Sequence, residues 1–536
     1  MMNVSTGGTG GLLLLGLLAI AIFGSLARVL KVPYPILLVI SGLGLSLVPH
    51  MPRFALPPNI VFLVFLPPLL YSAAWTLSWR EFQRNFKGIA MLAFGLVLAT
   101  VVLLTLFAKD FLPGFDWKSG LLLGAVVAAT DAIAATAVAS RMGLPHSIVA
   151  LLEAESLVND ATGLLALQFG VTILMTDRTP GFVEGVGRFV FLTAGGVAIG
   201  LLVGFVVAKI EEFIDDGPIE IVLSVLVPYA AYVLGERIHV SGVMAVIACG
   251  MYMSRQSINF MSAQVRLQST AVWDALTFAL NGIVFLLLGL QLPFVLAEIR
   301  GIPLRTLVFY GLGFSLAMIL LRVAWIFLEA TISGLFSRWR SDDKSVPKQG
   351  KRELAVVGWG GMRGVLSLAA AVSLPLTTAN GPFRQRSFII FLAFCLIVAT
   401  LVVQGLTLPF LIRKLGLAGQ SSLHVEEEEA RRTMLHEALA YLDRRRTADA
   451  YDGDVLDEMR AVYRGRLDAM PSTRHPGTQR GTMSRKQRHQ AILDVIEVER
   501  ATLLRLRNEQ KIDDEVLRTL QRELDLSESR VHTSVA

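Results

Sequence analysis

The chain has 536 residues, of which 54% are hydrophobic and 17% are charged. A soluble domain is usually about 25% charged, so this composition, with a mean hydropathy of +0.59, favours a polytopic membrane protein. The net charge of +6 does not indicate nucleic-acid binding, because the basic residues fall mainly in short loops between apolar segments. Cys249 and Cys395 lie within apolar segments and form neither a disulfide framework nor a metal-ligand pattern.

Thirteen apolar runs are candidates for membrane-crossing helices. They cover residues 11–27, 34–49, 59–78, 88–108, 119–140, 147–175, 188–210, 218–235, 239–254, 270–292, 304–330, 354–376 and 386–412. The first run is interpreted as a helix and not as a cleaved signal, because further apolar runs follow at once. An odd number of crossings puts the termini on opposite sides. The excess of loop Lys and Arg then predicts a cytoplasmic C-terminus and an N-terminus outside, in a cell (inner or plasma) membrane.

The composition changes after residue 416. Residues 1–416 are predicted to form the transmembrane domain, and residues 417–536 a helical cytoplasmic domain without a spanning segment. Its helices are expected near 424–446, 453–469, 484–510 and 513–526, with a linker rich in Pro, Gly, Ser and Thr at 471–482. Two hypotheses remain open for this domain. It either supports packing or dimerisation, or it regulates the membrane domain by sensing pH or an unknown ligand.

Three carboxylates, Asp131, Glu155 and Asp160, interrupt apolar segments. A charge at mid-bilayer costs at least about 2.5–3.5 kcal/mol, so such residues normally face a protein or water-filled interior. Small residues precede Thr130, so two helices can approach closely enough for Asp131 to meet Asp160. Two carboxylates with nearby hydroxyl or carbonyl oxygens suit an alkali cation or protons, which would then compete for the site.

Ser156 and Asp160 share one face of a predicted helix, and Glu155 and Asn159 share the adjacent face. Glu155 needs a partner, because a buried carboxylate is tolerable only when it is paired and hydrogen-bonded. Arg322 lies deep in another apolar run without a local acid. We therefore expect a Glu155–Arg322 ion pair, bridged or capped by Asn159, that supports the site structurally.

The segment GWGGMRG, residues 358–364, places four glycines around Arg363 within a predicted span. Glycines weaken a helix, so this span is expected to be locally unwound, with Arg363 near free backbone groups or the acids. The alternative is a helix packed through its glycines, with Arg363 extending to the surface. Asn281 and Gln291 are candidates for interior polar contacts, whereas His146 and His239 stand at predicted helix ends and are interpreted as loop histidines and not as proton relays.

Taken together, these motifs resemble the monovalent cation:proton antiporters, in particular the sodium/proton exchanger branch. The resemblance rests on Thr130–Asp131, Glu155–Ser156 with Asn159–Asp160, Arg322, GGMRG at 360–364 and SGVMAVIACG at 241–250. It covers nearly all of residues 11–412 and does not extend convincingly into the tail. One position departs from the family pattern, because Ala132 stands where a proline commonly follows the first aspartate.

The resemblance implies an all-α homodimer with about thirteen transmembrane helices, inverted repeats and two crossed, interrupted helices in a mobile core. Asp131 would lie at one crossover and the GGMRG segment at the other. Asp160 would be the main carboxylate that carries ion and proton, with Thr130, Asp131 and Ser156 completing a Na⁺ site. In this family an Asn–Asp pair accompanies electroneutral exchange, so Asn159–Asp160 implies one-for-one transport.

We therefore expect a Na⁺/H⁺ antiporter that works by alternating access in pH homeostasis. It would transport Na⁺ (or K⁺ or Li⁺) and H⁺, need no cofactor, contact membrane lipid and bind no nucleic acid. A K⁺(Na⁺)/H⁺ antiporter of the same fold is the alternative. An intramembrane aspartyl protease is disfavoured, because neither Asp131 nor Asp160 stands in a Tyr-Asp or Gly-x-Gly-Asp context. A membrane-tethered sensor whose tail is the output is a further rival.

Overall fold

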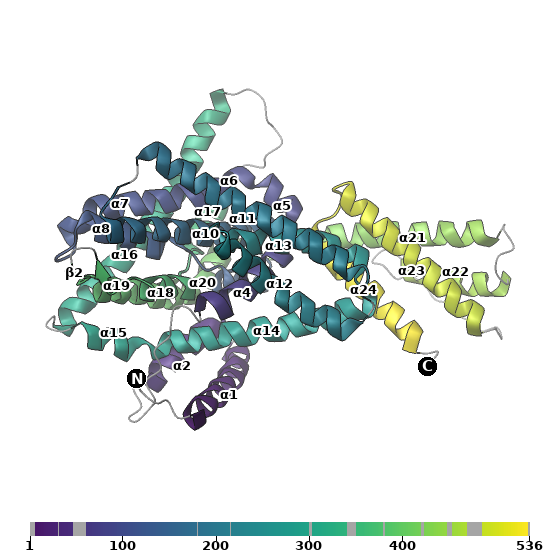
Figure 1. The fold of residues 1–536 in the computed structure, drawn as a ribbon. Helices are drawn as coiled ribbons and strands as arrows, with labels where there is room; N and C mark the ends of the chain where they lie inside the picture. Colours follow the sequence, from purple (N-terminus) through teal and green to yellow (C-terminus); the bar gives the residue numbers. More distant parts are fainter. Residues whose placement is uncertain are drawn as a thin grey trace.

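A bundle of long helices forms most of the computed structural model, and four further helices extend from one end of it (Figure 1). The structure describes residues 6–30, 32–46, 61–179, 181–214, 216–299, 303–339, 350–378, 381–419, 423–446, 453–468 and 485–533. Within these residues the only β-structure is a short antiparallel pair, β1 (Thr377–Thr378) and β2 (Gly381–Pro382). The predicted all-α polytopic fold is confirmed.

The described residues in the first half of the chain form thirteen helical segments, of which the last ends at Arg237. They are α1 (Thr6–Leu30), α2 (Tyr34–Ser46), η1 (Val61–Phe65), α4 (Leu66–Thr76), α5 (Trp79–Arg84), α6 (Phe86–Ala90), η2 (Met91–Leu96), α7 (Val97–Phe111), α8 (Trp117–Ala128), α9 (Ile133–Arg141), α10 (His146–Thr176), α11 (Phe182–Glu211) and α12 (Gly217–Arg237).

The second half completes the bundle and adds the tail. Its helices are α13 (Gly242–Phe260), α14 (Ala263–Leu290), α15 (Leu292–Glu298), α16 (Leu304–Trp339), α17 (Lys351–Trp359), α18 (Val365–Val372), α19 (Arg386–Ala399), η3 (Thr400–Gln404), α20 (Gly405–Lys414), α21 (Leu423–Arg446), α22 (Gly453–Asp468), α23 (Arg485–Asn508) and α24 (Asp514–Thr533).

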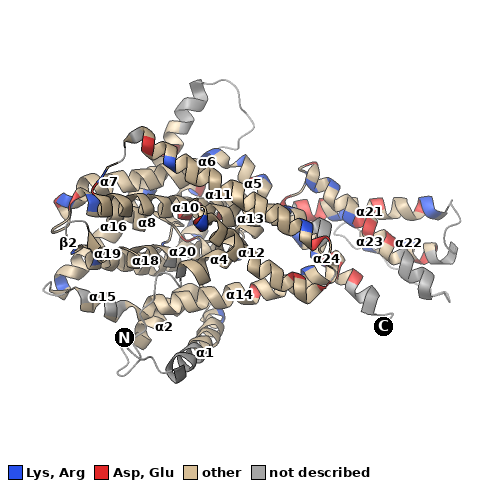
Figure 2. Ribbon diagram, in the orientation of Figure 1, with Lys and Arg blue, Asp and Glu red and all other residues tan. Residues whose placement is uncertain are grey.

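Length and apolarity identify the membrane-crossing part of the molecule. Among the described residues, 8 helices are long and apolar enough to cross a membrane, and three shorter apolar helices cover 16–30, 34–46 and 62–76. Figure 2 shows few charged residues through the middle of the bundle and many in the tail helices α21–α24. This distribution is that of a multi-pass membrane protein, because a charge is costly only where no water reaches it. The count of thirteen crossings stays a prediction.

Two predicted spans are interrupted near their middle. The run 119–140 is divided into α8 and α9, with non-helical backbone at 129–132, and the run 354–376 is divided into α17 and α18, with non-helical backbone at 361–364. The two breaks meet, since the backbone N–H of Asp131 donates to the carbonyl of Met362 at 2.8 Å. The predicted pair of crossed, interrupted helices is therefore present.

Among the other predicted boundaries, one agrees with the structure and one is shifted. The predicted division of 218–254 is present, because His239 adopts a positive φ of 60° and Ser241 caps α13 through the backbone N–H of Met244. Helix α14 begins at Ala263, seven residues before the predicted start at 270, since its first turns are polar and extend beyond the apolar run. The predicted linker at 471–482 and the predicted helix ends at 47–49 lie outside the described residues.

The tail helices pack on one another through two apolar clusters. One joins α21 to α23 and α24 around Met434, Leu503 and Leu520, and the other joins α21 to α22 around Leu442 and Tyr463. Neither cluster contains a described residue of the bundle. The apolar core of the tail is thus separate from that of the bundle, and polar contacts connect the two parts.

Candidate functional site

The first break is held open by side chains of α10. Ser156 Oγ donates to the carbonyl oxygen of Thr130 at 2.7 Å and accepts from the backbone N–H of Ala132 at 3.1 Å. Asn159 accepts from the backbone N–H of Thr130 at 3.2 Å and donates to the Thr130 hydroxyl. These bonds satisfy backbone groups that a continuous helix would pair internally, which is the condition for unwound backbone inside a membrane.

The second break is held by Arg363. Its guanidinium is buried and donates to the carbonyl oxygens of Ala128 and Ala129, the latter at 2.8 Å, and its backbone N–H donates to Thr400 Oγ1 at 3.0 Å. Those carbonyls are unpaired within α8 because the helix ends there, and a cation suits the negative end of a helix dipole. Arg363 therefore lies near free backbone groups, and the alternative in which it extends to the surface is wrong.

Asp131 lies at the point where the two breaks meet. One carboxylate oxygen accepts the backbone N–H of Ile133 at 2.8 Å, at the start of α9. The other oxygen faces Gly364 so closely that a Cβ added there would lie 2.0 Å from it. The absence of a side chain at Gly364 is thus what allows the carboxylate of Asp131 to lie beside the second break.

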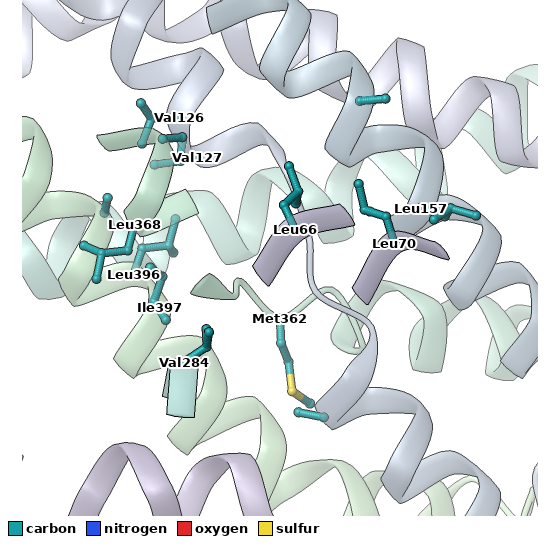
Figure 3. Close-up of a cluster of buried hydrophobic side chains, with 14 of the residues drawn as sticks. Leu66, Leu70, Val126, Val127, Leu157, Val284, Met362, Leu368, Leu396 and Ile397 are labelled. Atoms are coloured by element: carbon teal, nitrogen blue, oxygen red, sulfur yellow. The ribbon is translucent and has the colours of Figure 1, made fainter. Parts of the chain in front are cut away.

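A cavity of about 310 Å³ opens beside the crossover. Its lining includes Asp131, Ser156 and Asp160 on one side, and residues of α4 and α14, among them Asn281, on the other. Apolar side chains from several helices, including Leu66, Leu157 and Val284, surround the crossover, and Met362 of the second break lies among them (Figure 3). Among the described residues no hydrogen bond or ion pair engages the carboxylate of Asp160.

Glu155 and Arg322 lie together in the interior, as expected. Both side chains are about 2% exposed or less, and the guanidinium donates twice to the carboxylate, at 2.5 and 2.7 Å. Asn159 adds a 3.4 Å hydrogen bond to Glu155, and Arg322 also donates to the carbonyl of Val357 at 3.2 Å. This pair connects α10 to α16 and α17 next to the second break, and it leaves neither charge unpaired.

The predicted site residues therefore form two connected sets. Asp131, Ser156 and Asp160 line the cavity together with Thr130, whereas Glu155, Asn159, Arg322 and Arg363 hold the breaks in place. Of the two polar residues expected inside, Asn281 lines the cavity and is buried, and Gln291 is buried away from it. In the part of the chain that the structure describes, no group of three or more His, Cys, Asp or Glu side chains is arranged to hold a metal ion.

His146 stands at a helix end, as expected, but its interpretation as a loop histidine is wrong. It is the first residue of α10, and its two ring nitrogens lie 3.1 and 2.6 Å from carboxylate oxygens of Asp513 and Glu515 in the tail. The sequence offered no signal for this contact, because its partners come from a helix near the end of the chain. His239, by contrast, is exposed in the turn before α13, as expected.

The fold and the paired breaks define a membrane transport protein whose site lies at a helix crossover. A family model described as sodium/hydrogen exchanger, transmembrane, matches residues 15–414. The chain therefore belongs to the sodium/hydrogen exchanger family, as the motifs predicted. Members of this family are transporters, and the relatives below are named as exchangers or antiporters.

Several relatives are similar over most of their length. A Mycobacterium tuberculosis protein named as an uncharacterized Na⁺/H⁺ exchanger is 33% identical over 97% of this chain and 96% of its own. A sodium, potassium, lithium and rubidium/H⁺ antiporter of Bacillus pumilus is 30% identical, over 91% of this chain and 73% of its own. The sodium proton antiporter MjNhaP1 of Methanocaldococcus jannaschii shares the fold, with a TM-score of 0.58 at 21% identity over 76% of this chain and 98% of that one.

Proposed function

We propose that this protein exchanges Na⁺ for H⁺ across a cell membrane by alternating access, and that Asp160 is the carboxylate that carries either ion. The observation that carries the proposal is which charged side chains at the crossover have a partner and which do not. Glu155 is paired with Arg322 and the guanidinium of Arg363 is bound to carbonyl oxygens, whereas Asp160 has no hydrogen-bond or ion-pair partner among the described residues. An acid in that position binds either a cation or a proton, and the empty charged form crosses poorly.

The cation site would use oxygens from both sides of the first break. Asp160 and Asp131 would supply carboxylate oxygens, and Ser156 and Thr130 would supply hydroxyl oxygens, a donor set that suits a hard monovalent cation. Glu155, Asn159, Arg322 and Arg363 would then position this site without contacting the ion. Each of these four side chains is already engaged with the breaks or with another of the four.

The residue before Asp160, which is Asn159, supports one-for-one, electroneutral exchange. Asn159 is neutral, and its amide is occupied by Thr130 and Glu155. The position next to Asp160 therefore adds no second charge to the one that a single Na⁺ or a single proton neutralises at Asp160. A K⁺(Na⁺)/H⁺ antiporter is the second candidate, because the Bacillus pumilus relative is named for sodium, potassium, lithium and rubidium.

The remaining proposals concern the assembly. We propose a lipid-embedded homodimer with the division between membrane domain and tail at residues 416 and 417. The N-terminus would lie outside and the tail in the cytoplasm, where an unknown regulator can reach it. The many exposed large hydrophobic side chains on α11, α12 and α16 suit contact with lipid or with a second copy.

Exchange in proteoliposomes that contain a pH-sensitive dye tests the function. A Na⁺ gradient should drive proton efflux in the native protein, and Asp160→Asn should abolish it, because the amide cannot exchange the two ions. Asp274→Asn is the matched control, since Asp274 is exposed on α14 and does not line the cavity. Retained exchange in Asp160→Asn would contradict the proposal. Li⁺ and K⁺ gradients identify the cargo, and recording on a solid-supported membrane should show no transport current if exchange is electroneutral.

A further inference from the structure

The helices around the cavity belong to two packed groups. We call the first the scaffold group, in which α13 packs on α4 and α11, α14 packs on α1 and α2, and α12 packs on α13. We call the second the crossover group, in which α8 packs on α7 and α10, α19 packs on α16 and α18, and α20 packs on α9. The cavity lies where the two groups meet, because its lining combines residues of α4 and α14 with residues of α9, α10 and α18.

One carboxylate of the tail contacts α10 and the segment that follows α4. Asp513, just before α24, accepts a hydrogen bond from the hydroxyl of Ser78 at 2.8 Å, and its other oxygen lies 3.1 Å from Nε2 of His146. Ser78 lies between the end of α4, in the scaffold group, and α5, which it caps and which packs on α10, and His146 opens α10 in the crossover group. Asp513 is 3% exposed. Through Asp513 the tail therefore bridges α10 and the segment that follows α4, and α24 also contacts the scaffold group through Arg518 and Asp525.

Neighbouring contacts strengthen the bridge on both sides. Asp514 accepts the backbone N–H of Trp79 at 2.8 Å, Arg518 donates to the carbonyl of Thr76 at 2.8 Å, and Glu515 lies 2.6 Å from Nδ1 of His146. Further from the bridge, Arg266 of α14 makes a two-pronged contact with Asp525 at 2.6 and 2.8 Å. All of these contacts are polar or ionic, so each can be broken singly and reversibly.

The charges that face His146 come from its own helix and from the tail. They are Glu153 on α10 and Asp513 and Glu515 at the start of the last tail helix, and Arg518 lies near the two glutamates. Burial acts to raise the pKa of Asp513, but the imidazole of His146 holds this pKa at about 2. Asp513 thus stays ionised at any physiological pH, and the strength of the bridge depends on the positive charge of His146.

We propose that Asp513 and His146 form a clamp that restrains the crossover group against the scaffold group and so slows exchange while the tail is docked. The inference rests on the alternating-access function proposed above, because that mechanism requires the two groups to move past each other. Breaking the bridge should leave the ion site unchanged and should raise the turnover rate. The tail would therefore act as a brake that releases when its polar contacts are lost.

Two variants of the full-length protein break the bridge with little change in shape. His146→Gln removes the positive charge, and Asp513→Asn weakens the ion pair while it keeps an oxygen for Ser78. Each should raise the initial exchange rate in proteoliposomes severalfold, and the double variant should exceed neither single one, because both act on one contact. Glu437→Gln is the matched control, since it breaks the Arg505–Glu437 pair on the tail surface, away from the bundle.

Amide hydrogen exchange of the same proteins provides a readout that does not depend on transport. Release of the clamp should speed exchange in residues 78–82 and 146–150 and leave α8 unchanged. Unchanged or slower transport in both variants overturns the clamp, and so does unchanged amide protection. Absence of transport in the native protein would instead contradict the proposed function, and amide protection would then decide whether the bridge restrains α4 and α10.

Discussion

The backbone N–H of Ala132 donates a hydrogen bond to the hydroxyl oxygen of Ser156 at 3.1 Å. Proline has no N–H, so a chain with proline at this position could not form this bond. The same hydroxyl donates its hydrogen to the carbonyl of Thr130 at 2.7 Å, so the bond accepted from Ala132 leaves one of the two lone pairs of Ser156 for a cation. The unusual alanine therefore changes how much of a proposed cation ligand is available.

Ala132→Pro should raise the apparent affinity for Na⁺. Ala132 has φ −83°, close to the value that proline adopts, so the substitution should be tolerated by the backbone. Removing a competing hydrogen bond worth about 1 kcal/mol should lower the KM for Na⁺ by up to about fivefold. The measurement is exchange rate against Na⁺ concentration. Ala132→Ser keeps the N–H and should leave the KM unchanged, and an unchanged KM in a well-folded Ala132→Pro would show that Ser156 does not bind the ion.

Gly364→Ala should stop exchange. The added Cβ would lie 2.0 Å from a carboxylate oxygen of Asp131, so either Asp131 or the second break must move. Such overpacking typically costs about 1–3 kcal/mol, which is small enough for the protein to fold but large enough to displace the site. Gly313→Ala is a suitable control, because nothing lies within 4 Å of a Cβ added there. Native exchange rates in Gly364→Ala would show that Asp131 tolerates displacement.

The sequence predicted the second break but gave no compositional signal for the first. Gly358, Gly360, Gly361 and Gly364 weaken one helix directly, whereas the residues around Asp131 are alanines that favour a helix. The first break exists because Ser156 and Asn159 bind its backbone groups, and such bonds depend on how two helices approach. Only the family resemblance placed Asp131 at a crossover.

The paired interior charges could be anticipated, but the bridge to the tail could not. Glu155 and Arg322 each lie in a largely apolar run without a local side chain of opposite charge, so burial favours their pairing with each other. His146 and Asp513 both occur in polar surroundings near helix ends, where each could be solvated alone. Their contact follows from how the tail docks, and no local pattern encodes that arrangement.

Removing one charge of the Glu155–Arg322 pair should be worse than removing both. Glu155→Gln or Arg322→Met alone leaves a buried unpaired charge and should destabilise the protein by about 3–5 kcal/mol. The double variant leaves none and should recover part of that loss, visible as a higher melting temperature than in either single variant. If the double variant melts no higher than the worse single variant, the two side chains do not act as a pair.

The stability of the tail should fall as pH rises from about 4.5 to 7, because of Glu499 on α23. Burial raises the pKa of this side chain to about 7. Arg466, a 3.4 Å hydrogen bond from Tyr463 and Arg431 act in the opposite direction and lower the pKa, but burial outweighs them. The unfolded side chain titrates near pH 4.3, so the folded tail holds its proton more tightly across that window. The proton bound to Glu499 therefore stabilises the fold at acid pH, and this contribution, on the order of 4 kcal/mol, is lost as the pH rises through 7.

Amide hydrogen exchange of α23 in the full-length protein, corrected for the intrinsic chemical rates, measures this loss between pH 5.5 and pH 8. Glu499→Gln should flatten the dependence and protect α23 better than the native chain at pH 8, because the amide carries no charge to desolvate. Glu497→Gln, on the exposed face of the same helix, should keep the native dependence. If the amide protection of α23 changes equally with pH in the Glu499→Gln and native proteins, another group governs the pH response of the tail.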